Sequence, residues 1–236
     1  MPAEPCLLDT LTAALLDDPL YRWLYPDPSL RPVALRQNLR LTLELVVDVG
    51  RVETTADGAG VALWTAPGVE LLDDPAPFVA LLERWAPDRL EAALAGMAAC
   101  SGHRDPSAAV LHLLAVHPAR QGRRVGERLL APTLQRCDRA GTPVALESSN
   151  PRNLRFYRRA GFLALAGVAV PGGGPVMWPM RRLPGGGPPE RDERRGQAVP
   201  GRRREGGGTG VAHPRSVGAG VRDDVGEVPG SGQEQR

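Results

Sequence analysis

Runs of apolar residues along this chain alternate with polar or Gly- and Pro-rich breaks, and the clearest run lies near its middle. Residues 111–116 are apolar apart from His112, which predicts a strand buried on both faces. Pro118 ends this strand, because proline cannot donate a hydrogen bond to a sheet. A loop of Gly and Arg, residues 119–126, then leads into an amphipathic helix with Glu127 in its first turn. One face of that helix carries Leu129, Leu130, Thr133, Leu134 and Cys137 at helical spacing.

A second strand and helix follow directly. Residues 144–146 form another apolar run, and the polar residues 147–151 separate it from a helix expected over residues 152–162. Asn150 is a candidate N-cap for this helix. Asn153 and Tyr157 are four residues apart, so both side chains lie on one side of it.

The flanking regions contain further helices and strands. Helices are predicted at 10–16, 32–49, 78–85 and 88–100, with Asp88 as a candidate N-cap of the last. Strands are predicted at 51–56, 61–65, 163–170 and 176–180, the first two as a hairpin around 57–60. We expect one domain over residues 7–183. The tail, 184–236, is rich in Gly, Pro and Arg and is predicted to be disordered.

Composition narrows the function only slightly. The 236 residues have a net charge of +2, so nothing compels a nucleic-acid or membrane partner. Every basic residue of the Lys/Arg type is arginine, which favours coding bias over function as the cause of arginine clusters. No leader or membrane-length apolar run is evident, and a cytoplasmic protein with free thiols at Cys6, Cys100 and Cys137 is expected. His112 and His117 are expected on opposite faces without a third ligand, so we predict no metal site.

The loop before the central helix has a physical use. The first N–H groups of a helix lack partners inside it, and the helix dipole gives that end partial positive charge. A pyrophosphate can bind there if glycine leaves room for it. The loop alone also fits an ordinary strand-to-helix connection with solvated arginines.

Two motifs together resemble the GNAT (Gcn5-related N-acetyltransferase) superfamily. Residues 121–126 are similar to its pyrophosphate signature of Gln or Arg, two residues, Gly, one residue, Gly or Ala. The departure is Arg124, where the family has glycine. Residues 150–162, Asn-Pro-Arg-Asn-Leu-x-Phe-Tyr-x-x-x-Gly-Phe, are similar to its second signature. Within the superfamily, the Leu146–Ser149 run and the motif after it most resemble the puromycin N-acetyltransferases.

The resemblance implies a fold, a co-substrate and a set of roles. The fold is α/β (α+β), with a central mixed, mostly antiparallel sheet flanked by helices, and the co-substrate is acetyl-CoA. The backbone of Leu114, Ala115 and Val116 and the amide of Asn153 would bind the pantetheine arm. The pyrophosphate would be held by Gln121, Gly122, Arg123, Arg124, Val125 and Gly126.

Tyr157 is the candidate general acid, since a phenol can protonate a departing thiolate. Glu147, at a strand end facing the expected cleft, is the candidate general base. The alternatives are a core tyrosine and a surface or helix-capping acid. An acyl-enzyme is not expected, because Cys137 lacks an activating partner.

The acceptor is predicted to be a primary amine of a small molecule, such as an aminonucleoside or another antibiotic-like compound. Tyr21, Tyr25 and Trp64 are candidates for its binding site, or else they pack the core. Acetylation of a protein N-terminus or lysine is the second possibility. The third is a degenerate domain without catalysis, which the Arg124 departure and the apparent lack of a first strand support. The expected assembly is a monomer or homodimer.

Overall fold

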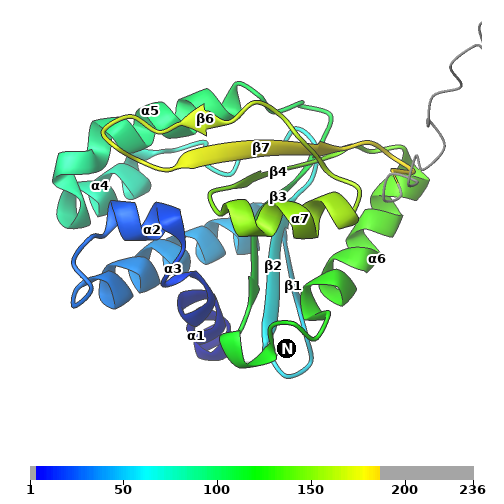
Figure 1. Ribbon diagram of the computed structural model, residues 1–236, viewed down its shortest axis with the longest axis horizontal. Coiled ribbons are helices and arrows are strands. Elements are labelled where there is room, and N and C mark those ends of the chain that lie inside the picture. Colours follow the sequence, from blue (N-terminus) through cyan, green and yellow to red (C-terminus); the bar gives the residue numbers. More distant parts are fainter. Residues whose placement is uncertain (1–3, 187–236) are drawn as a thin grey trace, which may run out of the picture. The chain divides into compact units, whose positions relative to one another are not determined.

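The computed structural model describes residues 4–186, whose main feature is a seven-stranded sheet (Figure 1). The strand order is β1-β2-β3-β4-β7-β5, and β6 pairs with β7 beside this path. The strands are β1 (Arg51–Thr54), β2 (Gly60–Thr65), β3 (Ala109–Val116), β4 (Val144–Ser148), β5 (Leu163–Ala164), β6 (Val168–Ala169) and β7 (Val176–Arg182). Only β3 and β4 run parallel among these pairs, which confirms the predicted mixed, mostly antiparallel sheet.

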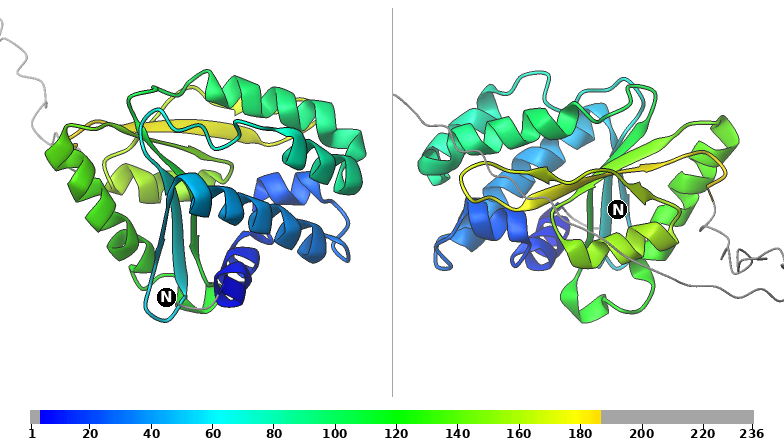
Figure 2. Two further views of the ribbon diagram at one scale, coloured as in Figure 1. Left: turned by 180° about the vertical axis from the view of Figure 1, so that it is seen from behind. Right: turned by 45° about the horizontal axis from the view of Figure 1, so that its top comes forward.

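Helices cover both faces of the sheet. They are α1 (Glu4–Leu15), α2 (Pro19–Leu24), α3 (Arg31–Val49), α4 (Ala76–Trp85), α5 (Leu90–Ser101), α6 (Val125–Ala140) and α7 (Pro151–Arg159), with the 3₁₀ turns Pro87–Arg89 and Pro118–Arg120. Helix α7 lies in front of the strands in Figure 1, and α3 crosses in front of them in the reverse view of Figure 2. None of the helices in residues 4–186 is long and apolar enough to cross a membrane.

Alternating side chains of the sheet build a separate core on each face. Val61 and Leu63 of β2 pack with apolar residues of α1 to α5. Their neighbours Ala62 and Trp64 pack instead with apolar residues of α6 and α7. This period of two is what a strand buried on both faces requires.

Several element boundaries differ from the predictions. Helix α1 begins at Glu4 rather than residue 10, and no strand precedes it within the described residues. Asp88 is not an N-cap, because it lies in a 3₁₀ turn and α5 begins after Arg89 without a side-chain cap. The strand predicted at 163–170 is split into β5 and β6, which both pair with β7. The predicted tail lies almost entirely outside the described residues.

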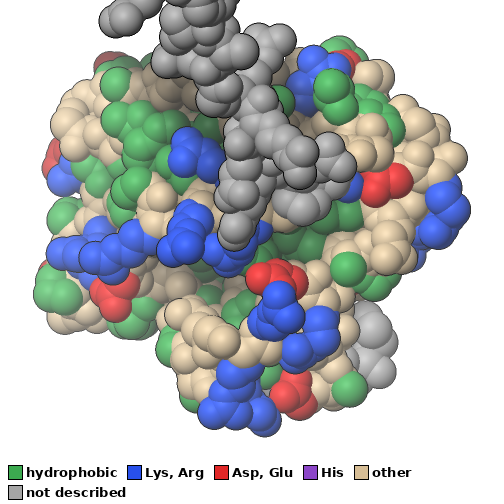
Figure 3. All heavy atoms as spheres, turned by 45° about the vertical axis from the view of Figure 1, so that its right-hand side comes forward, with side chains coloured by type: hydrophobic (Ala, Val, Ile, Leu, Met, Phe, Trp, Pro, Cys, Tyr) green, Lys and Arg blue, Asp and Glu red, His purple; other side chains and the backbone are tan. Residues whose placement is uncertain are grey.

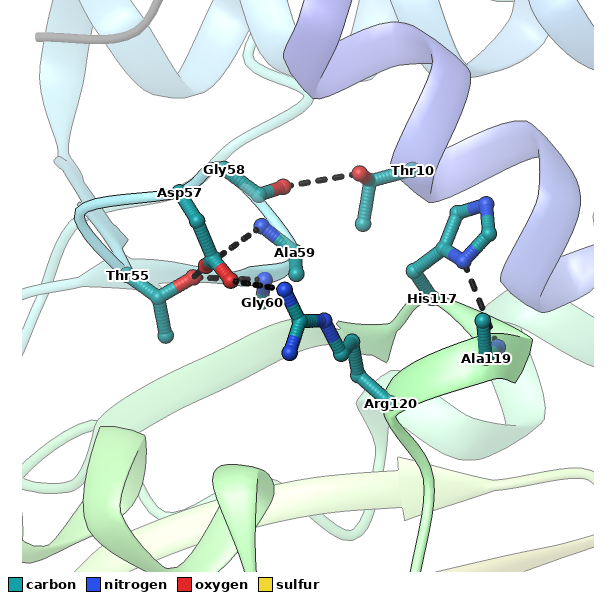
Figure 4. Close-up of polar contacts among 9 residues, drawn as sticks. All are labelled: Thr10, Thr55, Asp57, Gly58, Ala59, Gly60, His117, Ala119 and Arg120. Carbon is teal, nitrogen blue, oxygen red and sulfur yellow. Dashed lines mark hydrogen bonds and ion pairs between the residues drawn. The ribbon is translucent and has the colours of Figure 1, made fainter. Parts of the chain in front are cut away.

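The turn of the β1–β2 hairpin is held to neighbouring segments (Figure 4). The Asp57 carboxylate accepts hydrogen bonds from Thr55 Oγ1 at 2.8 Å and from the Ala59 N–H at 3.2 Å. Thr10 of α1 donates to the Gly58 carbonyl at 2.7 Å, and Arg120 forms an ion pair with Asp57 at 3.3 Å. These contacts connect the hairpin to α1 and to the loop that precedes α6.

Arg182, at the end of β7, joins three parts of the fold. Arg182 is only 5% exposed. Its guanidinium donates hydrogen bonds to both carboxylate oxygens of Asp138 on α6, at 2.6 and 2.8 Å. Its Nε also donates to the carbonyl of Ala160, just after α7, at 3.0 Å. The hydrogen bonds from Arg182, more than any other effect, lower the pKa of Asp138.

Arg124, which precedes α6, has a left-handed backbone with φ of 59° and ψ of 21°. It is the only non-glycine residue with positive φ in the described part of the chain. In this conformation a side chain clashes with the following carbonyl. The glycine that the resembled family has at this position would be free of that strain.

We predict that Arg182→Met lowers the free energy of unfolding by about 2–4 kcal/mol. The substitution leaves the Ala160 carbonyl without the Arg182 donor and the Asp138 carboxylate with only the Gly185 N–H, at 2.8 Å. Urea denaturation measures this. Arg181→Met is the matched control: Arg181 pairs with Asp105 from a half-exposed position, so its loss should cost less than about 1 kcal/mol. If the two variants lost equal amounts of stability, the role of Arg182 as a buried link between α6 and the end of α7 would be wrong.

The effect of Arg182→Met should depend on pH. Because Asp138 has a lowered pKa in the folded state, its stabilisation is present above the unfolded pKa of about 3.9 and is lost as the pH falls through the folded value. The difference in stability between wild type and variant should therefore shrink below about pH 4.

For the strained position, we predict that Arg124→Gly raises the free energy of unfolding by roughly 0.5–1 kcal/mol. The exposed ion pair from Arg124 to Glu127 contributes little against this gain. Gly122→Ala is the reverse control. Gly122 has φ of 73° and nothing lies within 4 Å of an added Cβ, so backbone strain, without any steric clash, is the expected cause of its effect. It should lower stability by about 1 kcal/mol.

Candidate active site

Strands β3 and β4 diverge soon after they begin to pair. Their parallel register runs only from Ala109 opposite Val144 to Leu111 opposite Leu146. Beyond Leu111, β3 pairs with β2 alone within the described residues. The backbone groups of residues 112–115 that face the β4 side therefore have no strand partner among the described residues, and a ligand could bind to them.

A β-bulge marks the point of divergence. Leu63 of β2 is opposite Leu113 whereas Trp64 is opposite Leu111, so His112 is the extra residue. The His112 Nε2 lies 2.9 Å from Thr65 Oγ1. Burial first, and then the charge of Arg104, lower the pKa of His112 to about 4. Its ring is therefore neutral at physiological pH.

The loop at 121–126 meets the start of α6 at the open end of β3. The Gln121 amide donates from Nε2 to the Val116 carbonyl at 3.0 Å, which holds the loop against the strand end. Gly122 borders open space, whereas a Cβ on Gly126 would lie 3.2 Å from the ring of Phe156 on α7. Gly126 thus permits close packing of α6 on α7.

Arginine supplies most of the charge around this loop. Figure 3 shows arginine side chains, in blue, widely spread over the side of the molecule on which α6 lies. Arg120 is paired with Asp57 and Arg124 with Glu127. Arg123 has no ion pair within residues 4–186, so its charge is the least compensated of the three.

Asn153 and Tyr157 of α7 face a cavity of about 170 Å³, which we call the cleft cavity. Leu114 of β3 and Glu147 of β4 also line it. The predicted cap is confirmed, since Asn150 accepts from the Arg152 N–H at 3.1 Å. Burial first, and then the charge of Asp18, raise the pKa of Tyr157, so its hydroxyl stays protonated at neutral pH.

Glu147 has a partner that the sequence did not suggest. Arg104, in the loop before β3, donates from Nε and Nη2 to the two carboxylate oxygens of Glu147 at 2.8 and 3.0 Å. Both side chains are largely buried, with 26% and 18% of their surfaces exposed. This bidentate contact fixes the direction of the carboxylate.

Asp18 is a second residue that sequence reasoning missed. It caps α2 by accepting from the Leu20 N–H at 3.0 Å, and it also accepts from the Ser149 hydroxyl. Burial is the main cause that raises the pKa of its carboxyl group. A Ser-Ser-Asn turn after β4 and an Asp before Pro19 were visible in the chain, but nothing in their spacing linked them.

A larger cavity of about 530 Å³, which we call the helical cavity, adjoins the cleft cavity. The two share walls from Tyr21, residues 111–113, Glu147 and Met177. Of the aromatic residues predicted to bind the acceptor, Tyr21 lines both cavities.

Tyr25 and Trp64 line neither of these cavities. Each is at most 3% exposed and packs in the core. The Tyr25 hydroxyl accepts from Asn38 Nδ2 at 3.0 Å, and Trp64 lies between the sheet and α6. The sequence could not distinguish these positions, because a buried aromatic side chain suits a core and a pocket equally well.

The histidines have separate surroundings. His117 Nδ1 accepts from the Ala119 N–H at 3.3 Å and so caps the 3₁₀ turn (Figure 4). Among the residues described, no group of three or more His, Cys, Asp or Glu side chains is arranged to hold a metal ion.

Known proteins share both the sequence pattern and the fold. Residues 58–162 match the family described as Acetyltransferase (GNAT) family. A solved structure from Corynebacterium glutamicum, described as histone acetyltransferase HPA2 and related acetyltransferase, is 24% identical with a TM-score of 0.56. That match covers 78% of this chain and 94% of the other. Arylalkylamine N-acetyltransferase 2 from Aedes aegypti is 12% identical with a TM-score of 0.52, covering 76% and 93%.

At these identities the two solved structures establish the fold alone. The family match covers the bulged strand β3, the loop and the start of α6, and the helix that carries Tyr157. Residues 58–162 are therefore similar to the GNAT acetyltransferase family, and the chain shares the fold of the two solved acetyltransferases.

Proposed function

We propose that this domain transfers the acetyl group of acetyl-CoA to a primary amine of a small molecule. The observation that carries the proposal is the cleft cavity, which Glu147 and Tyr157 both line beside the unpaired edge of β3. A proton acceptor and a proton donor on one cavity are what aminolysis of a thioester needs.

The residues present fit acetyl-CoA. The backbone of residues 114–116 lies on the diverging strand, where an amide-containing arm can add its hydrogen bonds. Asn153 lines the same cavity. The loop from Gln121 to Gly126 precedes a 16-residue helix and has open space at Gly122, which suits a pyrophosphate. Bound there, acetyl-CoA supplies an activated acyl group.

In the proposed reaction, Glu147 accepts the proton that the amine loses as it attacks the thioester, directly or through water. Tyr157 donates its hydroxyl proton to the sulfur as the thiol leaves. Arg104 is a positioning residue, because it holds the Glu147 carboxylate by both oxygens. Attack is direct: burial raises the pKa of the Cys137 and Cys100 thiols, the latter to about 11, which disfavours the thiolate that an acyl-enzyme needs.

We further propose an aminonucleoside or a similar antibiotic-like amine as the acceptor. The likeness of residues 146–157 to the puromycin N-acetyltransferases supports this choice, and so does a cavity of about 530 Å³ that Glu147 helps to line. An extended surface groove would have favoured a protein N-terminus or lysine. The proposal locates the reaction in the cytoplasm, where acetyl-CoA is available, with the protein as a monomer or homodimer.

We predict that Tyr157→Phe lowers kcat by about 10²-fold or more at saturating acetyl-CoA, because the departing thiolate loses its proton donor. Thiol release measures turnover, and calorimetry should show that acetyl-CoA still binds. Tyr25→Phe is the matched control: it removes a hydroxyl in the core, outside both cavities, and should leave kcat within about twofold. An unchanged rate for Tyr157→Phe would remove it from the mechanism.

Glu147→Gln tests the proton acceptor. The amide keeps the shape of the side chain and one acceptor for Arg104, so we expect folding to persist while kcat/KM falls by about 10²-fold. Glu83→Gln, at an exposed position of α4, should change neither quantity. If calorimetry detects no acetyl-CoA binding even to the wild type, the proposed function as a whole is wrong and a domain without catalysis is the better interpretation.

A further inference from the structure

The helical cavity has a composition that restricts what it can bind. Its volume of about 530 Å³ is within the range of ligand pockets. Side chains of α2 to α5, of β3, of β7 and of the loop before α4 line it. Most of its wall on the helical side is hydrocarbon, with Leu41 and Leu45 from α3, Phe78 from α4 and Leu94 and Met97 from α5.

The polar side chains of α3 that reach this cavity are already engaged. Asn38 donates to the Tyr25 hydroxyl, and the Thr42 hydroxyl donates to the Asn38 carbonyl at 3.0 Å. An acceptor with many hydroxyl or amide groups would therefore lose its hydrogen bonds to water here without adequate replacement. A hydrocarbon group has no such cost, and it gains from leaving water.

Charged groups lie at the wall that the two cavities share, and Glu70, at an exposed position before α4, also lines the helical cavity. Glu147 is part of that wall, and its partner Arg104 lines the helical cavity next to it. Asp18, with its carboxyl group, lies on the cleft side. The wall is thus balanced or negative in charge, which suits an amine and disfavours an acceptor that carries an anionic group close to its nitrogen.

From this arrangement we infer that the acceptor is a primary amine with an apolar body. The inference rests on the proposed acetyl transfer to a small-molecule amine. It disfavours the aminonucleoside among the acceptors proposed above, because ribose hydroxyls would lose their hydrogen bonds to water in this cavity. The amine nitrogen lies at the shared wall near Glu147, and the hydrocarbon body occupies the helical cavity. Polar polyamines, aminoglycoside-like amines and peptide N-termini with polar neighbours are then poor acceptors.

A series of n-alkylamines from ethylamine to hexylamine tests this, because the amine is equally basic throughout and only the hydrocarbon length changes. With thiol release from acetyl-CoA as the measurement, kcat/KM should rise about fourfold per methylene, the factor that corresponds to about 0.8 kcal/mol for each CH₂ buried. Pentane-1,5-diamine, nearly the same length as hexylamine, should be at least about tenfold poorer, because its second ammonium would be buried.

Variants locate the effect in the helical cavity. Leu45→Trp fills part of it from α3, and Met97→Trp fills it from α5, so the test survives if one variant fails to fold. Each should lower the ratio of kcat/KM for hexylamine to that for ethylamine by about tenfold or more. Val47→Trp is the matched control on α3: Val47 is 66% exposed, and the ratio should not change.

The outcomes separate the two proposals. If ethylamine and hexylamine react equally well, or if Val47→Trp changes the ratio as much as the cavity variants do, the apolar acceptor is wrong while acetyl transfer stands. If no amine releases thiol and acetyl-CoA does not bind, the proposed function is wrong, and so is the inference about the acceptor that rests on it.

Discussion

The early divergence of the parallel strands β3 and β4 is the constraint on which the rest of this structure depends. A strand in the middle of a sheet normally has both rows of backbone groups paired, because an unpaired buried N–H or C=O costs free energy. Here β3 keeps β2 along its length but keeps β4 for only three residue pairs. The bulge at His112 allows this change of direction without breaking the β2–β3 ladder.

The two helices that follow these strands are placed by the divergence. Helix α6 begins beyond the end of β3, and α7 begins beyond the end of β4, so each helix follows one of the two diverging strands. Gly126 lets α6 approach Phe156 of α7 closely, and Arg182 ties Asp138 of α6 to the residue after α7. The strain at Arg124 is sustained by fixed points on either side of it, because Gln121 is bonded to the end of β3 and Val125 and Gly126 are buried.

Contacts between distant segments orient the groups around the gap. Arg104 directs the Glu147 carboxylate from a loop 43 residues earlier. The bond from Ser149 to Asp18 holds the start of α2 against the turn before α7, across 131 residues of chain. The helices α2 to α5 thereby close a mostly apolar cavity against the same carboxylate. The proposed catalytic groups and most of the walls of the helical cavity thus come from different halves of the sequence.

The sequence by itself determined the local parts of this protein. Apolar runs and Pro118 predicted β3, the spacing of Leu129 to Cys137 predicted α6, and Asn150 predicted the start of α7, because these features depend only on neighbours along the chain. The resemblance over residues 121–162 predicted the mixed, mostly antiparallel sheet that the structure has. Tertiary structure alone decided that Glu147 is paired with Arg104, that Tyr25 and Trp64 are in the core, and that β5 and β6 are separate strands. Periodicity carries information about which face a residue occupies, but not about which distant residue it meets there.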